Sequence, residues 1–349
     1  MCIRDSTIGA WRAGFALKVY DHHDGVSNWN GIYALQMYQD GALVNGFHMN
    51  TFAFKESRYI NCHLDYEEQV TNKAYFNRTY PLPGNKLSVY DKKEGIIPLH
   101  KNKPSHIKMI AKDMDGNKSV FEFWVKRGEV DAPPTRNYNY DFPYGKANSI
   151  ALNSFKANFP SGTFYENIYV KYETSPDESA DVYSDIHRLG KKTTPVHKYY
   201  DISIQPTAFP AALKDKAVIA YCEGDKMISQ GGKWKGDFLT ARVRSLGDYC
   251  ITVDHTPPSI EPKQFSSNMV GASRMTFKIK DSMPTGGKAK GLRFKGYIDG
   301  RWVLMEHDEK KDLLTHRFDS RTIKGEHVFK LVVKDDRGNE AIFQELFRR

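Results

Sequence analysis

Hydrophobic and polar residues alternate with a period of two along much of this chain, which is the pattern of strands with one buried and one solvated face. The clearest runs place these apolar residues at every second position: Leu239, Ala241 and Val243; Met275, Phe277 and Ile279; Phe329, Leu331 and Val333. Turn signals that tolerate positive φ separate such runs, at Asp40-Gly41, Asp299-Gly300 and Gly338-Asn339. Long segments with a 3.6-residue period are absent. The pattern predicts an all-β protein of antiparallel β-sandwiches, immunoglobulin-like or fibronectin-like.

Two proline pairs divide the chain, Pro133-Pro134 and Pro257-Pro258. Each follows a strand-like run that ends in an acidic residue, and proline cannot continue a ladder because it lacks the N–H donor. We predict domain junctions there, which gives three tandem sandwiches at about residues 7–130, 131–255 and 256–349.

The first and third segments are predicted to be repeats of one another. FALKVYD at residue 15 matches MTFKIKD 260 positions later, and YQDG at 38 matches YIDG 259 positions later. KMIAKDMDGN at 108 then matches KLVVKDDRGN 222 positions later. The drop of 37 between the last two offsets predicts an insertion in the first domain, which we place at about residues 45–100.

Composition and charge exclude several classes of function. The net charge is +9, but the basic residues are interleaved with acidic ones, so the footprint of a nucleic-acid-binding protein is missing. Weak attraction to an anionic envelope polymer is compatible with this charge. No apolar run is long enough to predict a membrane span. Residues 1–6, MCIRDS, resemble a translated sequencing-adapter artefact, so we expect the native start and any export signal to lie upstream.

The motifs that suggest chemistry each have a structural explanation, and we predict no catalytic residue and no metal ligand. DMDGN, residues 113–117, begins like a calcium loop but lacks the EF-hand glycine and glutamate positions, which favours a hairpin turn. HExxH and HxH are absent, His22-His23 lies in a loop-like stretch, and His187 and His197 have no apparent third ligand. Cys62 adjoins His63, but neighbours on a strand point to opposite faces, so we expect no nucleophile and base there.

The remaining cysteines leave one alternative open. Cys222 and Cys250 fit either a disulfide in an exported protein or two buried thiols. Cys2 lies within the suspected artefact.

The inserted segment is rich in tyrosine and in hydrogen-bonding side chains. Such a mixture is typical of sugar- and peptide-binding surfaces, and also of a layer that packs against a neighbouring sheet. Packing is the favoured reading. The candidate ligand-binding surface consists of Arg58, Tyr59, His63, Asp65, Tyr66 and Tyr80.

The order of several unusual strings resembles the region that follows the catalytic domain in lysostaphin-type zinc metallopeptidases of Bacteroidetes-type bacteria. In the first domain these strings are NGIYALQMYQDG, RYINCHLDYEE, RTYPLPGNKLSVY and DMDGN; in the second, YENIYVKYE, SDIHRLGKKTTPVHKYY and LTARVRSLGDYCITVD. The third domain contributes KIKDSM, YIDGRWVLMEHDEKKDLLTHRFD and KLVVKDDRGN. The resemblance therefore covers nearly the whole chain.

This resemblance implies a parent enzyme, a murein endopeptidase that cuts peptidoglycan cross-bridges with a zinc-activated water. The family's His-x-His ligand motif is not present here, and the His-x-x-x-Asp spacing of His197 and Asp201 therefore stands without its partner motif. No catalytic residue is carried over, and zinc is expected only in the missing catalytic domain. The implied function is an accessory region, exported to the periplasm or cell envelope, which scaffolds or positions that domain. Its expected partners are peptidoglycan or other envelope polymers and the upstream catalytic domain. The alternative is a free-standing β-sandwich adhesin or glycan-binding protein.

Overall fold

The chain is an all-β protein of tandem β-sandwich domains, with 47% of its residues in strands and 7% in helices. The computed structural model describes residues 6–349 except 131, 133, 134, 136, 178 and 180. The predicted junction at Pro133-Pro134 and the first five residues, Cys2 included, lie outside the described residues. Pro257 and Pro258 lie between two strands and belong to neither.

The first domain is built around a six-stranded sheet in the order β1-β12-β11-β6-β7-β9. Small two-stranded sheets, β2 with β10, β3 with β8 and β4 with β5, complete it. Its strands are β1 (Ser6–Ile8), β2 (Arg12–Ala13), β3 (Ala16–Lys18), β4 (Asp21–His22), β5 (Trp29–Asn30), β6 (Ala34–Gln39), β7 (Ala42–His48), β8 (Phe76–Arg78), β9 (Tyr90–Lys93), β10 (Ile97–Pro98), β11 (Ser105–Lys112) and β12 (Lys118–Arg127). Leu35, Met37, Phe47, Ile107 and Met109 lie in its core.

The segment between β7 and β11 holds the helices of this domain. They are the 3-10 helix η1 (Phe54–Tyr59) and the helices α1 (Ile60–His63) and α2 (Tyr66–Asn72). The strand expected at Cys62 and His63 was therefore wrong, because both residues lie in α1. They have different partners: the Cys62 thiol donates to the Tyr59 carbonyl at 3.1 Å, and His63 Nδ1 lies 2.8 Å from the Tyr90 hydroxyl.

The middle domain stacks two five-stranded sheets, in the orders β14-β15-β19-β23-β22 and β17-β18-β24-β20-β21. Its strands are β13 (Tyr140–Phe142), β14 (Asn148–Ala151), β15 (Phe155–Phe159), β16 (Ile168–Val170), β17 (Tyr172–Ser175), β18 (Ile186–Leu189), β19 (Tyr200–Ile204), β20 (Ala217–Glu223), β21 (Lys226–Ser229), β22 (Lys233–Lys235), β23 (Phe238–Val243) and β24 (Gly247–Val253), and the 3-10 helix η2 spans Ala211–Lys216. Phe155, Tyr200, Ile202, Tyr249 and Ile251 are among the buried residues of one continuous core between the sheets.

The third domain pairs two four-stranded sheets, β25-β26-β30-β29 and β28-β27-β31-β32. Its strands are β25 (Ser259–Gln264), β26 (Arg274–Lys280), β27 (Arg293–Ile298), β28 (Arg301–Val303), β29 (Glu306–Asp308), β30 (Leu313–Arg317), β31 (Glu326–Lys334) and β32 (Glu340–Arg348). The predicted alternation is confirmed here, since Met275, Phe277 and Ile279 are buried within 1% exposure and face Phe329 and its neighbours across the core.

Strand register relates the first and third domains, since β6, β11 and β12 correspond to β27, β31 and β32. Met109 pairs with Met37 and with Phe121, and Leu331 pairs with Gly296 and with Phe343. Met37 and Gly296 are 259 positions apart, and Met109 and Leu331, like Phe121 and Phe343, are 222 apart. These are the offsets found between the repeats in the sequence. The turns are also equivalent, because Asp40 and Asp299 both take φ of 50° and accept from the backbone N–H of residues 106 and 328 respectively.

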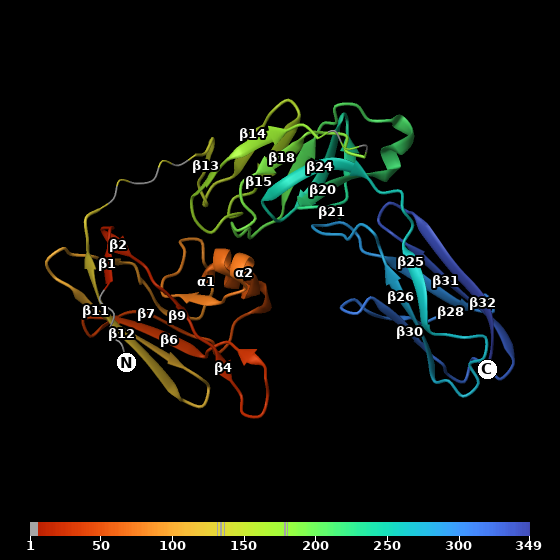
Figure 1. Cartoon of the computed structure of the whole chain (residues 1–349), viewed down its shortest axis with the longest axis horizontal. Coiled ribbons are helices and arrows are strands. Elements are labelled where there is room, and N and C mark those ends of the chain that lie inside the picture. Colours follow the sequence, from red (N-terminus) through yellow and green to blue (C-terminus); the bar gives the residue numbers. More distant parts are fainter. Residues whose placement is uncertain (1–5, 131, 133–134, 136, 178, 180) are drawn as a thin grey trace.

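The three domains form an arch with the middle domain at its top (Figure 1), and no sheet of the described residues mixes strands from two of the predicted segments. Helices α1 and α2 lie on the side of the first domain that faces the middle domain. No helix in the described part of the chain has the length and apolar character needed to cross a membrane.

Candidate functional site

Arg58 and Tyr59, two of the candidate surface residues, contact the middle domain. The Arg58 guanidinium donates to the Val196 carbonyl from Nε at 3.2 Å and from Nη2 at 2.9 Å. The Tyr59 ring stacks on His197 at a centroid distance of 4.4 Å. These two side chains therefore belong to the joint between the first and middle domains.

Tyr165 of the middle domain is the centre of this joint. It is 2% exposed and packs with Cys62 and Leu82 of the first domain. Its hydroxyl donates to the Arg58 carbonyl at 3.0 Å and lies 3.0 Å from His197 Nδ1. Burial, and then the nearby Arg58 charge, lowers the pKa of His197 to about 4, so this imidazole is neutral at physiological pH.

Of the other four candidates, His63 and Asp65 have local structural roles and Tyr80 packs at the joint. His63 is 1% exposed, and burial lowers its pKa to about 4. Asp65 caps α2 by accepting from the Glu68 N–H at 3.3 Å. Tyr80 is half-buried against the Tyr165 cluster, and Tyr66 is half-buried on α2. The structure thus disperses this group between a joint, a core and a helix cap, while ligand binding by any of them stays a prediction.

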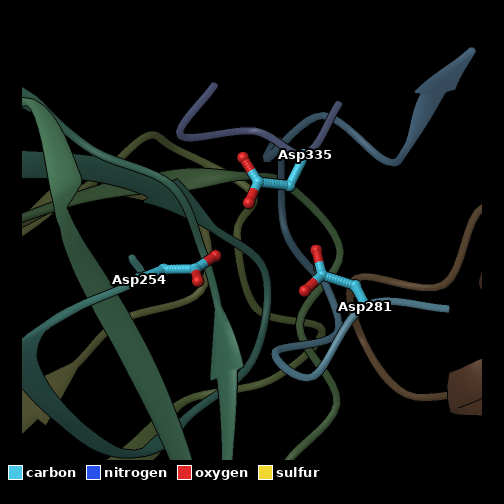
Figure 2. Close-up of side chains that lie close together, drawn as sticks. All are labelled: Asp254, Asp281 and Asp335. Atoms are coloured by element: carbon cyan, nitrogen blue, oxygen red, sulfur yellow. The ribbon is translucent and has the colours of Figure 1, made fainter. Parts of the chain in front are cut away.

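Three carboxylates meet at the joint between the middle and third domains. Asp254, Asp281 and Asp335 each offer an oxygen, and these oxygens all lie within 4.8 Å of one another (Figure 2). Each residue directly follows a strand, β24, β26 or β31. Sequence reasoning missed this cluster because the three residues lie in two domains; the signal in the chain is an aspartate at each of three strand ends.

The pKa of Asp254 is raised to about 6, first by burial and then by the charges of Asp281 and Asp335. The pKa of Asp281 is also raised, first by burial. Oxygen ligands of this kind suit a hard cation such as Ca²⁺. Both oxygens of Asp335, however, accept from Asn339, at 2.9 Å from its backbone N–H and 2.6 Å from its side-chain amide.

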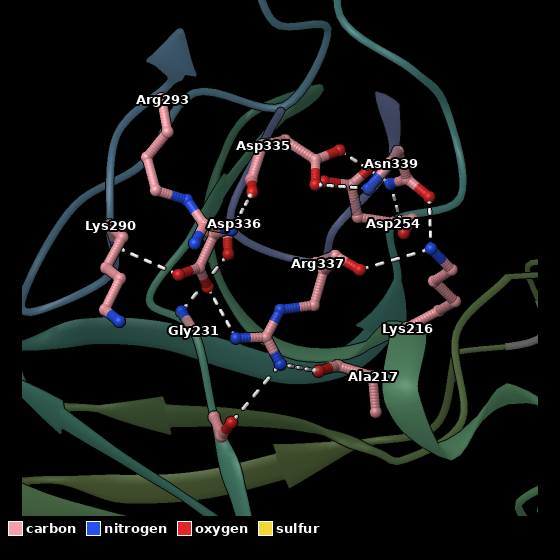
Figure 3. A network of polar contacts seen from close by, with 12 residues as sticks. Lys216, Ala217, Gly231, Asp254, Lys290, Arg293, Asp335, Asp336, Arg337 and Asn339 are labelled. Carbon is pink, nitrogen blue, oxygen red and sulfur yellow. Dashed lines mark hydrogen bonds and ion pairs between the residues drawn. The ribbon is translucent and has the colours of Figure 1, made fainter. Parts of the chain in front are cut away.

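Basic and amide groups complete this joint (Figure 3). The Lys216 ammonium donates to the Arg337 carbonyl at 3.1 Å. Arg337 Nη1 donates to the carbonyls of Ala217 at 3.1 Å and Gly232 at 3.3 Å, and the Asn339 amide donates to the Asp254 carbonyl at 2.9 Å. The cluster is thus part of a polar interface that fixes the third domain against the middle one.

A pocket of about 820 Å³ opens on the third domain, and we call it the Trp302 pocket. Three large apolar side chains in its lining are exposed, Trp302 at 62%, Leu304 at 61% and Ile323 at 69%. Its charged lining residues are Asp299, Arg301, Glu306, Arg317, Asp319 and Arg321. An indole face next to guanidinium groups suits a ligand with sugar rings and carboxylates.

A buried histidine lies in the wall of this pocket. His316 is 6% exposed, and its Nδ1 lies 2.9 Å from the Leu304 carbonyl. Its Nε2 is buried and has no hydrogen-bond partner among the described residues. Sequence reasoning did not select these residues, although the string RWVLMEHD puts an arginine and a tryptophan directly after the Asp299-Gly300 turn.

The middle domain matches a known domain family. The Zu5-like domain family matches residues 139–254, which fall within the predicted middle segment. The chain is thus a tandem β-sandwich protein whose second domain is similar to Zu5-like domains. No curated protein matches the chain.

Solved structures are similar only at a distance. The mixed-linkage glucan utilization locus protein SGBP-B of Bacteroides ovatus, solved with a mixed-linkage heptasaccharide, is 11% identical over 90% of this chain and 60% of its own, with a TM-score of 0.17. A 1.5-MDa bacterial ice-binding adhesin is 9% identical over 92% of this chain and 87% of its own, at 0.18. The Down Syndrome Cell Adhesion Molecule is 10% identical over 99% of this chain and 46% of its own, at 0.20. TM-scores this low do not indicate a shared arrangement of whole chains.

Proposed function

We propose that this chain is a non-catalytic accessory region of an exported protein, and that its third domain binds an anionic envelope polymer, peptidoglycan in particular. The observation that carries this proposal is the Trp302 pocket. Its exposed indole offers a stacking face for a sugar ring, and Arg301 offers a partner for a carboxylate of a peptide stem. Arg317 and Arg321 already lie 3.4 Å from Glu306 and 3.9 Å from Asp319, so they would have to exchange these partners for a ligand carboxylate.

The two joints support an accessory role. Tyr165 and Arg58 fix the first domain to the middle one, and Arg337 and Asn339 fix the third. A chain held in this way would keep a polymer-binding pocket at a set distance from whatever is attached to its other end. We propose a lysostaphin-type zinc metallopeptidase as the parent protein; this rests on the sequence resemblance alone.

Binding to purified peptidoglycan sacculi tests the proposal. We expect the chain to co-sediment with sacculi, and Trp302→Ala to weaken the apparent affinity by about tenfold or more, since stacking of a ring on an aromatic side chain contributes about 1–3 kcal/mol. Trp29→Ala is the matched control, because Trp29 is as exposed (65%) but lies in the first domain. Equal binding by wild type and Trp302→Ala would remove the pocket from the proposal.

The second candidate is a free-standing β-sandwich adhesin or glycan-binding protein, which the exposed Trp302 also favours. The two candidates differ in the charge of the ligand. If the arginines take part, binding weakens with added salt and prefers sacculi over a neutral glucan; binding to a neutral glucan that is insensitive to salt favours the second candidate. We also expect no release of muropeptides when the chain is incubated with sacculi and zinc.

A further inference from the structure

Cys222 and Cys250 are neighbours on two paired strands of the middle domain. Cys222 lies on β20 and pairs with Asp248, while Cys250 lies on β24 and pairs with Ala220, so the two cysteines are diagonal neighbours across one ladder. Their sulfur atoms are 3.5 Å apart. Residues at this diagonal have their side chains on the same face of the sheet and within reach of each other, so the two sulfurs point toward one another.

The two thiols differ in exposure. Cys250 is fully buried, while Cys222 is half-buried. Hydrogen bonding to Cys250 lowers the pKa of Cys222, and the same contact together with burial raises that of Cys250. Cys222 is therefore the sulfur that a reagent in solution reaches first and the one that ionises first.

Neither thiol is engaged in another bond that would keep the two sulfurs apart. Each is free, and the sulfurs are each other's hydrogen-bond partner. A disulfide requires a sulfur–sulfur distance of about 2.05 Å and a Cα separation of about 4.4–6.8 Å. Diagonal neighbours have Cα atoms about 7–8 Å apart, so closing the 3.5 Å gap between the sulfurs requires side-chain rotation together with a small approach of the two strands.

We propose that Cys222 and Cys250 form a reversible disulfide by exchange with a disulfide oxidant such as oxidised glutathione. The Cys222 thiolate attacks one sulfur of the oxidant, which gives a mixed disulfide and releases one glutathione thiolate that takes up the proton lost by Cys222. Cys250 then loses its proton, its sulfur attacks the Cys222 sulfur, and the second glutathione leaves as a thiol. Two protein thiols are oxidised and one glutathione disulfide is reduced.

The cross-link would strengthen the half of the middle domain that holds the third domain. β20 begins at Ala217, whose carbonyl accepts from Arg337, and β24 ends just before Asp254. A bond between these strands constrains the chain between residues 222 and 250 in the unfolded state. The oxidised protein is therefore expected to resist thermal unfolding of this domain more than the reduced protein.

Thiol counting by mass spectrometry tests the pairing. In a Cys2→Ser background, the reduced and unfolded chain should take up three alkyl groups, on Cys62, Cys222 and Cys250. After equilibration with an excess of oxidised glutathione it should take up one, on Cys62, which is 1% exposed. A tryptic peptide pair joined through Cys222 and Cys250 identifies the bond. If both cysteines remain alkylatable or carry only glutathione, or if the bond joins two chains, the proposal is wrong.

Calorimetry with a matched variant tests the consequence. The unfolding transition of the middle domain should rise by about 10 °C on oxidation and fall back with dithiothreitol. Cys222→Ser should show no shift, since serine keeps the size of the side chain and removes the bond. A shift of equal size in Cys222→Ser would show that oxidation acts elsewhere.

Discussion

The first and third domains each have an equivalent turn, between β11 and β12 in the first and between β31 and β32 in the third. Only the turn of the third domain contacts the middle domain. Both turns are closed by the same backbone hydrogen bond: the Asp335 N–H donates to the Asn339 carbonyl at 3.1 Å, and the Asp113 N–H donates to the Asn117 carbonyl at 3.3 Å. The two turns differ at their second residue, Asp336 in one copy and Met114 in the other, and at their third, Arg337 and Asp115. Arg337→Asp therefore gives the docked turn the residue that the exposed turn already has, and we expect it to undock the third domain without unfolding it.

The contacts of Arg337 set the size of this effect. Its guanidinium donates to two carbonyls of the middle domain, Ala217 and Gly232, and its side chain is only 15% exposed. Hydrogen bonds from charged groups contribute about 1.5–3 kcal/mol each, so the substitution removes about 3–6 kcal/mol from the docking free energy. An introduced carboxylate would also face those carbonyl oxygens.

Small-angle scattering and limited proteolysis measure the undocking. We expect Arg337→Asp to increase the radius of gyration and to speed cleavage within residues 255–258, while the circular dichroism stays unchanged. Asp115→Arg is the matched control, because that turn is exposed, and it should alter neither measurement. If Arg337→Asp scatters and is cleaved like the wild type, the third domain is not held by these bonds.

Three further predictions concern the joints. Tyr165→Phe leaves the Arg58 carbonyl and His197 Nδ1 without their hydroxyl partner, so it should weaken docking of the first domain by about 1–3 kcal/mol, measured by denaturant unfolding. Gly84→Ala should open the same joint, measured by scattering, because a Cβ there would lie 2.7 Å from the Tyr165 carbonyl oxygen; Gly25→Ala, on an open turn, should not. Asp254 has a pKa raised to about 6 by burial, so its protonated form is favoured when docked. Docking of the third domain should be tighter at pH 5 than at pH 7.5, as measured by proteolysis, and Asp254→Asn should reduce that difference, the remainder arising from Asp281, whose pKa is also raised by burial.

The strands of the repeat domains were predictable because the signal is local. A strand can be recognised from the alternation of polar and apolar residues alone. The strand pairing of Met109 with Met37 and of Leu331 with Gly296 agrees with the offsets that the repeats show in the sequence. Turns such as Asp299-Gly300 carry their own chemistry, because positive φ restricts the residue type. Fold class and the relation between the first and third domains therefore followed from the sequence.

The helices of the insertion and the joints were not predictable in the same way. α1 has four residues and α2 has seven, which is too short for a periodic signal and too short for stability in isolation. Contacts with Tyr165 and Val196 of another domain support η1 and α1. Likewise, the carboxylate cluster exists only after two domains have docked.

The two joints differ in chemistry, and this difference gives them opposite responses to pH. At the first joint His197 has a pKa near 4 because of burial and the Arg58 charge, so a drop to pH 5 favours the undocked state, in which the imidazole can take a proton at its ordinary pKa. At the second joint the raised pKa of Asp254 means that protonation near pH 6 relieves repulsion among three carboxylates and favours docking. We therefore expect acidification to loosen the first joint and to tighten the second.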